Sequence, residues 1–98
     1  MSRARTLGAT TTLIADDVLV NRRRGRFSLL LGSDRLVLSR DEQCEDIDLE
    51  SIGQVTSTIT DRRVRLRFHT IDGSTWTIRW FDAPGCRTSM LLELLNGR

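Results

Sequence analysis

The sequence predicts a mainly β domain with one amphipathic helix at its C-terminal end. Apolar and polar residues alternate through residues 62–81, a Gly-Ser-Asp turn separates two β-rich runs near residue 32, and leucines recur at helical spacing near the C-terminus. Alternation with a period of two is typical of strands with one buried face, and the leucine spacing is typical of a helix. The length of 98 residues fits a single domain.

The first half of the chain contains three strand candidates. The first is Thr12–Val20, and residues 1–11 before it are interpreted as a flexible tail. The next two, Phe27–Leu31 and Arg35–Arg40, flank the turn Gly32-Ser33-Asp34. Two β-rich runs around such a turn predict a hairpin.

An acidic segment, residues 41–50, follows this hairpin. Within it we expect a short strand through Ile47 and then a single turn over residues 49–52. A further strand is predicted over residues 54–60, because this stretch is rich in threonine, valine and isoleucine.

The strongest pattern is the late hairpin, whose register the sequence decides. A two-residue turn would set Phe68 opposite Thr77 and mix the two faces. A three-residue loop ending at Gly73 sets Phe68 opposite Trp76 and keeps the apolar side chains on one face, so we predict this register. The same alternation predicts that Trp76 and Trp80 pack in the core rather than stack with bases.

The C-terminal segment is predicted to be a helix. Asp82 is placed to cap it, Pro84 suits its first turn, and Asn96-Gly97 is a stop signal. The apolar stripe that packs on the β structure is predicted to consist of Met90, Leu91, Leu94 and Leu95.

Composition narrows the environment of the chain. No apolar run approaches the roughly 20 residues that a membrane span needs, and the N-terminal residues do not have the pattern of a secretory signal, so we expect a cytoplasmic protein. Cys44 and Cys86 stand far apart in the sequence, and we interpret them as two lone thiols rather than a disulfide. Cys86 is expected on the helix as a small apolar residue.

The order of these elements resembles the pleckstrin-homology-like (PH-like) fold, and the middle of the chain is similar to the GRAM and prokaryotic PH-like subgroup. The resemblance is carried by Gly25-Arg26-Phe27, Ser33-Asp34-Arg35-Leu36, the strand and turn from Ile47 to Ile52, and the late hairpin from Thr70 to Trp76. Ser33 departs from the threonine that is usual in the subgroup. The resemblance implies antiparallel strands in two packed sheets or a partly open barrel over residues 12–98. The alternative fold is a small SH3-like or OB-like barrel.

Catalytic constellations are not apparent in the sequence. The single histidine, His69, lies on the polar face of a predicted strand, and there is no nucleophile elbow, phosphate loop or zinc-ligand spacing. We therefore expect a binding module rather than an enzyme, without a metal ion or a cofactor.

Two groups of arginines are the candidate binding residues. The first group lies in the loop between the first two strands and consists of Arg22, Arg23, Arg24 and Arg26. The resemblance implies an anionic-lipid contact here, because the same loop is basic in PH domains that bind phosphoinositides. The second group lies on the polar face of the late hairpin and consists of Arg63, Arg65, Arg67 and Arg79. Each group has the alternative interpretation of solvated surface charges.

Three binding functions follow from these groups. The first hypothesis is a protein-interaction adaptor, with head-to-tail self-association of the basic residues near 24 and the acidic residues near 45 as one form of it. The second is binding of an anionic lipid or phosphoinositide surface through the first arginine group. The third is nucleic-acid binding by a small β-barrel, against which the small net charge of +2 argues.

Overall fold

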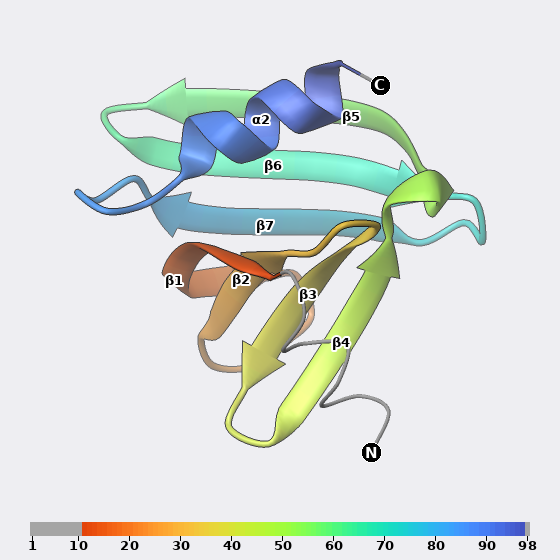
Figure 1. The fold of residues 1–98 in the computed structure, drawn as a ribbon, viewed down its shortest axis with the longest axis horizontal. Helices are drawn as coiled ribbons and strands as arrows, with labels where there is room; N and C mark the ends of the chain where they lie inside the picture. Colours follow the sequence, from red (N-terminus) through yellow and green to blue (C-terminus); the bar gives the residue numbers. More distant parts are fainter. Residues whose placement is uncertain (1–10, 98) are drawn as a thin grey trace.

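The computed structural model describes residues 11–97, so the tail predicted over residues 1–11 lies outside the described residues except at Thr11. The described chain forms one seven-stranded antiparallel sheet with the strand order β4-β3-β2-β1-β7-β6-β5 (Figure 1). The strands are β1 (Thr12–Val20), β2 (Phe27–Leu31), β3 (Arg35–Arg40), β4 (Gln43–Asp48), β5 (Ile52–Thr60), β6 (Arg63–Thr70) and β7 (Thr75–Phe81). The mainly β prediction is confirmed. Because β4 and β5 remain as two edges, the sheet is not closed into a barrel.

The turn predicted after Ile47 is a short 3-10 helix, η1 (Leu49–Ser51). Asp48 precedes it and its carboxylate accepts a hydrogen bond from the backbone N–H of Glu50. The following strand begins at Ile52, two residues earlier than the sequence predicted. Ile52 is buried, and this apolar residue starts the strand at the edge of the core.

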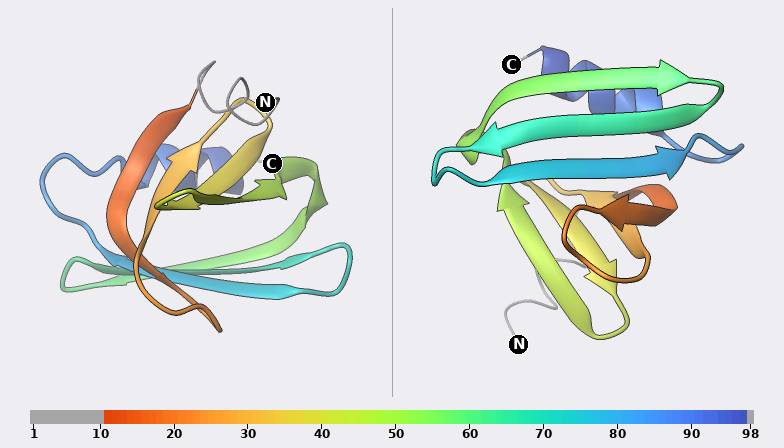
Figure 2. Two further views of the ribbon diagram at one scale, coloured as in Figure 1. Left: turned by 90° about the horizontal axis from the view of Figure 1, so that it is seen from below. Right: turned by 180° about the vertical axis from the view of Figure 1, so that it is seen from behind.

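Strand β1 bends the sheet into two facing halves (Figure 2). Its register against β2 shifts twice, between Leu13 and Ala15 and again between Ala15 and Val18. Each shift inserts an extra residue in β1, and such bulges bend and twist a strand. The bend carries the end of β1 to β7, where only Leu19 and Val20 find partners.

The late hairpin has the register that the sequence predicted. Gly73 adopts a left-handed φ of 93°, as the three-residue loop requires. The paired residues on the inner face are Val64 with Trp80, Leu66 with Ile78, and Phe68 with Trp76. Trp80 is buried as predicted, whereas Trp76 is only half-buried at the margin of the core.

One hydrophobic core fills the space between the two halves of the sheet. Its fully buried members in the sheet come from β1, β2, β3, β6 and β7 and include Ile14, Leu29, Leu36, Leu38, Leu66, Phe68 and Ile78. Burying this apolar surface is the main favourable contribution to folding. The helix α2 (Thr88–Asn96) closes one end of the core and packs on β1 and β5.

The helix start differs from the prediction. The residues Asp82, Pro84 and Cys86 lie in the loop before α2, so none of them caps it or belongs to its first turn. Arg87 occupies the cap position without a side-chain cap bond. Asp82 instead contacts the helix start from a distance in the sequence: its carboxylate accepts a hydrogen bond from the side-chain hydroxyl of Thr88, the first residue of α2.

The apolar stripe of the helix was also predicted only in part. Leu91 and Leu95 are buried, but Met90 and Leu94 are 44% and 41% exposed. The buried face instead includes Thr88, whose hydroxyl accepts a hydrogen bond from the Trp80 indole at 3.0 Å. Thr88, Leu91 and Leu95 recur at helical spacing and form the buried face of α2. Compared with the predicted stripe, this face is rotated about the helix axis toward Thr88, which the hydrogen bond from Trp80 holds inside the core.

Candidate binding surface

The first arginine group does not converge on one site. Arg23 turns back across the molecule, and its guanidinium donates to the Glu45 carboxylate at 2.8 and 3.2 Å. The same guanidinium lies 5.3 Å from the centre of the Trp76 ring. The hydrogen bond to Glu45 raises the pKa of Arg23, so this arginine is a fixed cation with an internal partner.

The remaining members of the group differ in their surroundings. Arg22 and Arg24 are exposed, and neither side chain has a partner among the described residues. The Arg24 carbonyl accepts a hydrogen bond from the Arg40 guanidinium, which also lies against Gly25. A Cβ at residue 25 would come within 2.8 Å of that guanidinium, so the glycine permits the close approach. Arg26 is the last residue of the loop, and it lines a groove beside β1.

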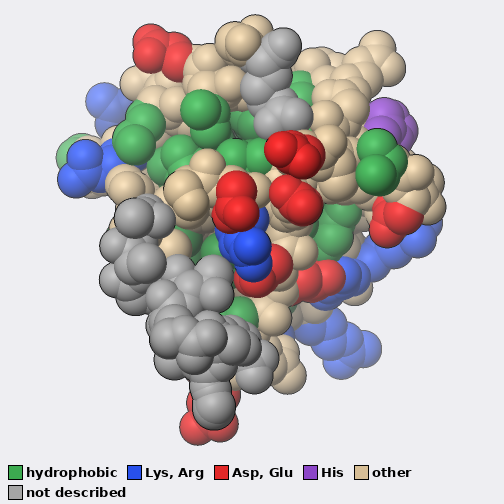
Figure 3. Space-filling view, turned by 45° about the vertical axis from the view of Figure 1, so that its right-hand side comes forward, with side chains coloured by type: hydrophobic (Ala, Val, Ile, Leu, Met, Phe, Trp, Pro, Cys, Tyr) green, Lys and Arg blue, Asp and Glu red, His purple; other side chains and the backbone are tan. Residues whose placement is uncertain are grey.

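The acidic segment is likewise partly neutralised within the chain. Arg35 forms ion pairs with Asp34 at 2.9 Å and with Asp46 at 3.0 Å. Hydrogen bonds from Arg35 lower the pKa of Asp34. Figure 3 shows acidic and basic side chains mixed on one face of the molecule. Arg23, Glu45 and Asp46 are therefore already paired within one chain, although the predicted head-to-tail association would need them for contacts between two chains. That association stays a prediction.

The second arginine group is brought together as predicted. Arg63, Arg65 and Arg67 lie on the outer face of β6, and Arg79 of β7 lies directly opposite Arg65. All four are exposed, and none forms an ion pair with another described residue. We call these four residues the arginine face. No other described element lies in front of this side of β5–β7 (Figure 2, right).

Polar side chains extend the arginine face toward the edge of the sheet. Arg67 pairs across the strands with Thr56 of β5, and Arg65 pairs with Thr58. A shallow hollow of about 290 Å³ lies over this part of the sheet and is also lined by His69. The His69 ring shares a hydrogen bond with Thr75 at 3.0 Å. The hollow therefore offers hydrogen-bond donors and positive charge to an anion.

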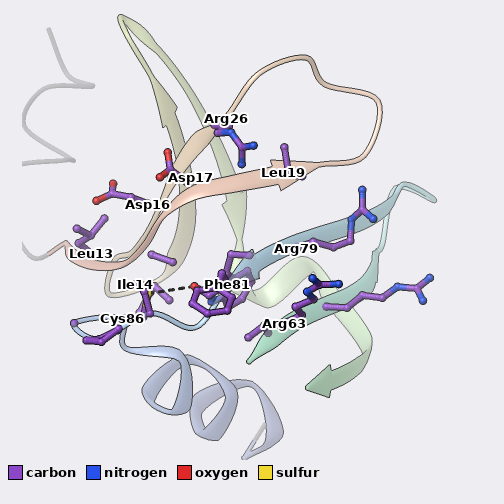
Figure 4. A pocket seen from close by; sticks show the side chains of 17 residues that line it. Leu13, Ile14, Asp16, Asp17, Leu19, Arg26, Arg63, Arg79, Phe81 and Cys86 are labelled. Atoms are coloured by element: carbon purple, nitrogen blue, oxygen red, sulfur yellow. Dashed lines mark hydrogen bonds between the residues drawn. The ribbon is translucent and has the colours of Figure 1, made fainter. Parts of the chain in front are cut away.

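A larger groove of about 740 Å³ opens beside the arginine face, between β1 and the ends of β6 and β7 (Figure 4). It exists because β1 pairs with β7 only at Leu19 and Val20, so that the part of β1 before Leu19 lies apart from the end of β7. Its floor includes the buried residues Ile14 and Trp80. The loop after β7 closes one end, where the Arg87 N–H donates to the Ile14 carbonyl at 2.9 Å.

The two walls of this groove differ in charge. Asp16 and Asp17 line the β1 side together with Arg26 from the loop before β2, whereas Arg63 and Arg79 line the side of the hairpin (Figure 4). Three large apolar side chains remain exposed along the groove, namely Leu13 at 44%, Leu19 at 38% and Phe81 at 52%. We call this site the β1–β7 groove.

The sequence did not reveal the β1–β7 groove, although one signal for it was present. Phe81 follows Thr75, Thr77 and Arg79 on the polar face of β7, so its position breaks the alternation. An exposed aromatic residue at a polar-face position is a reason to expect a binding surface. The bulges of β1, which open the groove, have no such signal in the sequence.

The described residues show no arrangement for a metal ion. Within residues 11–97 no group of three or more histidine, cysteine or carboxylate side chains lies together. Cys44 and Cys86 are both free thiols, as the sequence predicted, and each is half-buried. No helix among residues 11–97 is long and apolar enough to cross a bilayer.

Comparisons with protein-family models, with curated proteins and with solved structures gave no significant match. The PH-like resemblance therefore stays an expectation.

Proposed function

We propose that the chain is a non-catalytic protein-interaction module that binds an acidic segment of a partner protein through the arginine face. The observation that carries the proposal is the uneven use of charge. Arg23 and Arg35 are paired with carboxylates of the same chain, whereas the arginine face has no acidic partner among the described residues. The four arginines of the face are thus held together on one surface without an internal carboxylate, and an external anion can bind them.

The geometry of the face supports a carboxylate-bearing partner. Arg65 and Arg79 lie directly opposite each other, and like charges across a strand pair are unfavourable. A carboxylate between them relieves this repulsion and accepts two parallel hydrogen bonds from a guanidinium. The paired strands fix the backbone positions of the four arginines on one surface, so binding has to order only their side chains.

Exposed apolar residues next to the face favour protein over nucleic acid or lipid. Phe81 and Leu19 adjoin the arginines, and arginine together with aromatic residues is typical of protein interfaces. Nucleic-acid binding by stacking needs several exposed rings, and the outer face of β7 offers Phe81 alone. A membrane contact through the first group would have only Arg22 and Arg24 as exposed cations without an internal or groove position.

The test measures fluorescence anisotropy of a labelled glutamate-rich peptide with the full chain at low salt. Arg65→Gln/Arg67→Gln should weaken binding by about tenfold for each arginine, the loss expected for one charge-assisted hydrogen bond. Raising the salt from 0.1 M to 1 M should weaken wild-type binding, because the Debye length falls from about 10 Å to about 3 Å.

Arg22→Gln/Arg24→Gln is the matched control, since it removes the same charge from exposed residues outside the face. It should bind the peptide like the wild type. The proposal is wrong if both double variants lose binding equally or if the wild type ignores the peptide. It is also wrong if anionic vesicles or single-stranded RNA bind more tightly than the peptide and lose binding in the control variant.

A further inference from the structure

We infer that the β1–β7 groove receives one apolar side chain of the acidic segment, so that the recognised motif is an apolar residue with carboxylates on one side. This inference rests on the proposed function, because the same segment would contact the arginine face. It adds the part of the motif that gives specificity, which charge alone does not supply.

The groove has the size and lining of a site for an apolar group. Its volume of about 740 Å³ falls in the range of ligand sites, and its floor is formed by buried apolar residues such as Ile14 and Trp80. Of the large apolar residues that the structure leaves exposed, Leu13, Leu19 and Phe81 line this groove. An apolar side chain seated beside Phe81 would remove part of this exposed apolar surface from water.

The charges on the walls set the direction of the segment. A carboxylate on the hairpin side meets only guanidinium groups, those of Arg63 and Arg79, whereas on the β1 side the two carboxylates of Asp16 and Asp17 outnumber the one guanidinium of Arg26 (Figure 4). Asp16 is held in place by a hydrogen bond from the Ser28 hydroxyl at 2.8 Å. The side of β6 and β7 is therefore the more favourable one for the acidic residues of the segment.

The same aspartates argue against a lipid as the occupant. An anionic bilayer pressed against the groove would place its headgroups next to Asp16 and Asp17, which repel them. A peptide avoids this contact because it can carry its carboxylates on one side only. The occupant that fits both walls is thus a polypeptide segment.

Two labelled peptides test the inference with the intact chain. One has the sequence Glu-Ser-Glu-Leu-Glu-Ser-Glu, and in the other serine replaces the central leucine. We expect the leucine peptide to bind roughly tenfold more tightly, the gain for burying most of one leucine side chain. Phe81→Ser should remove this difference and leave the affinity of the serine peptide unchanged, and Ile71→Ser, at another exposed apolar residue, should preserve it.

The native cysteines provide a second readout. Cys86 lines the groove, while Cys44 lies in a separate hollow near β4. The leucine peptide should slow alkylation of Cys86 by a maleimide and leave the rate at Cys44 unchanged. In the Cys44→Ser background, alkylated Cys86 should reduce the affinity of the leucine peptide to that of the serine peptide.

The outcomes separate the two proposals. Equal affinity of the two peptides, with binding still lost in Arg65→Gln/Arg67→Gln, would overturn the groove inference and leave the proposed function standing. Protection of Cys44 instead of Cys86 would overturn it as well. Failure of both peptides to bind at low salt would overturn the inference together with the proposed function, and tighter binding of anionic vesicles that protect Cys86 would identify a lipid occupant instead.

Discussion

Thr88 links the helix to the sheet through a short chain of hydrogen bonds. The Trp80 indole N–H donates to the Thr88 hydroxyl at 3.0 Å, and that hydroxyl donates to the Asp82 carboxylate at 2.7 Å. Trp80 and Thr88 are almost completely buried, at 4% and 3% exposure. A buried indole N–H without an acceptor lowers the stability of the fold, so the Thr88 hydroxyl stabilises the protein by accepting this hydrogen bond. The same hydroxyl also fixes the first residue of the helix against Trp80 and Asp82.

Thr88→Val is the variant that tests this link. Valine has nearly the same shape but no hydroxyl, so the indole of Trp80 loses its acceptor inside the protein. We expect the free energy of unfolding to fall by about 1–3 kcal/mol, measured by urea denaturation followed through tryptophan fluorescence.

The neighbouring residue supplies the control for Thr88→Val. Ser89 is exposed at the next position of the helix, and Ser89→Ala should change stability by less than about 0.5 kcal/mol. Equal losses in the two variants would show that the first turn of the helix, and not the buried hydroxyl, is responsible.

Among the elements, β1 determines where the groove lies. Asp17 sits within its second bulge and has a left-handed φ of 57°. Aspartate tolerates this conformation better than most residues because its short side chain hydrogen-bonds locally. The bulge turns the end of β1 onto β7 and leaves the two strands apart near Phe81, where the groove opens.

Replacing Asp17 by glycine or by valine tests the backbone requirement of this bulge. Both variants remove the same carboxylate, but valine is β-branched and strained at positive φ, whereas glycine is not. Asp17→Val should therefore be less stable than Asp17→Gly by about 1–2 kcal/mol in urea denaturation. If the two variants unfold at the same urea concentration, the left-handed conformation at residue 17 is not maintained in solution.

The elements differ in how far the sequence could predict them. Each apolar position of β6 has an apolar partner in β7, so the alternation specified both faces and the register of this hairpin. The helix start was mispredicted because Asp82 and Pro84 suit a helix cap locally, while a hydrogen bond to Thr88 uses Asp82 in the folded chain. The bulges of β1 were not predicted, since they depend on pairing with both β2 and β7.

On the scale of the whole molecule, the bent sheet separates two kinds of surface. The half formed by β2–β4 carries the ion pairs of Arg35 and the carboxylate of Glu45 that binds Arg23 of the preceding loop, and the half formed by β5–β7 carries the arginine face. The net charge of +2 does not reveal this separation. The sequence placed the second arginine group correctly because the period of two in a strand determines on which face a side chain lies. The first group lies in a loop, where no such period predicts the position of a side chain.

The helix completes the fold by covering the open end between the two halves, and a matched pair of leucines tests this role. Leu91 is fully buried against the core, whereas Leu94 is 41% exposed in the same helix. Leu91→Ala should cost about 2–5 kcal/mol, because it deletes buried methyl groups and leaves a cavity in a site closed on both sides by the sheet. Leu94→Ala should change stability by less than about 0.5 kcal/mol, with the same change in helix propensity. Urea denaturation of both variants measures the difference. Equal losses would return both leucines to the buried stripe that the sequence predicted, and would mean that α2 is rotated about its axis relative to this structure.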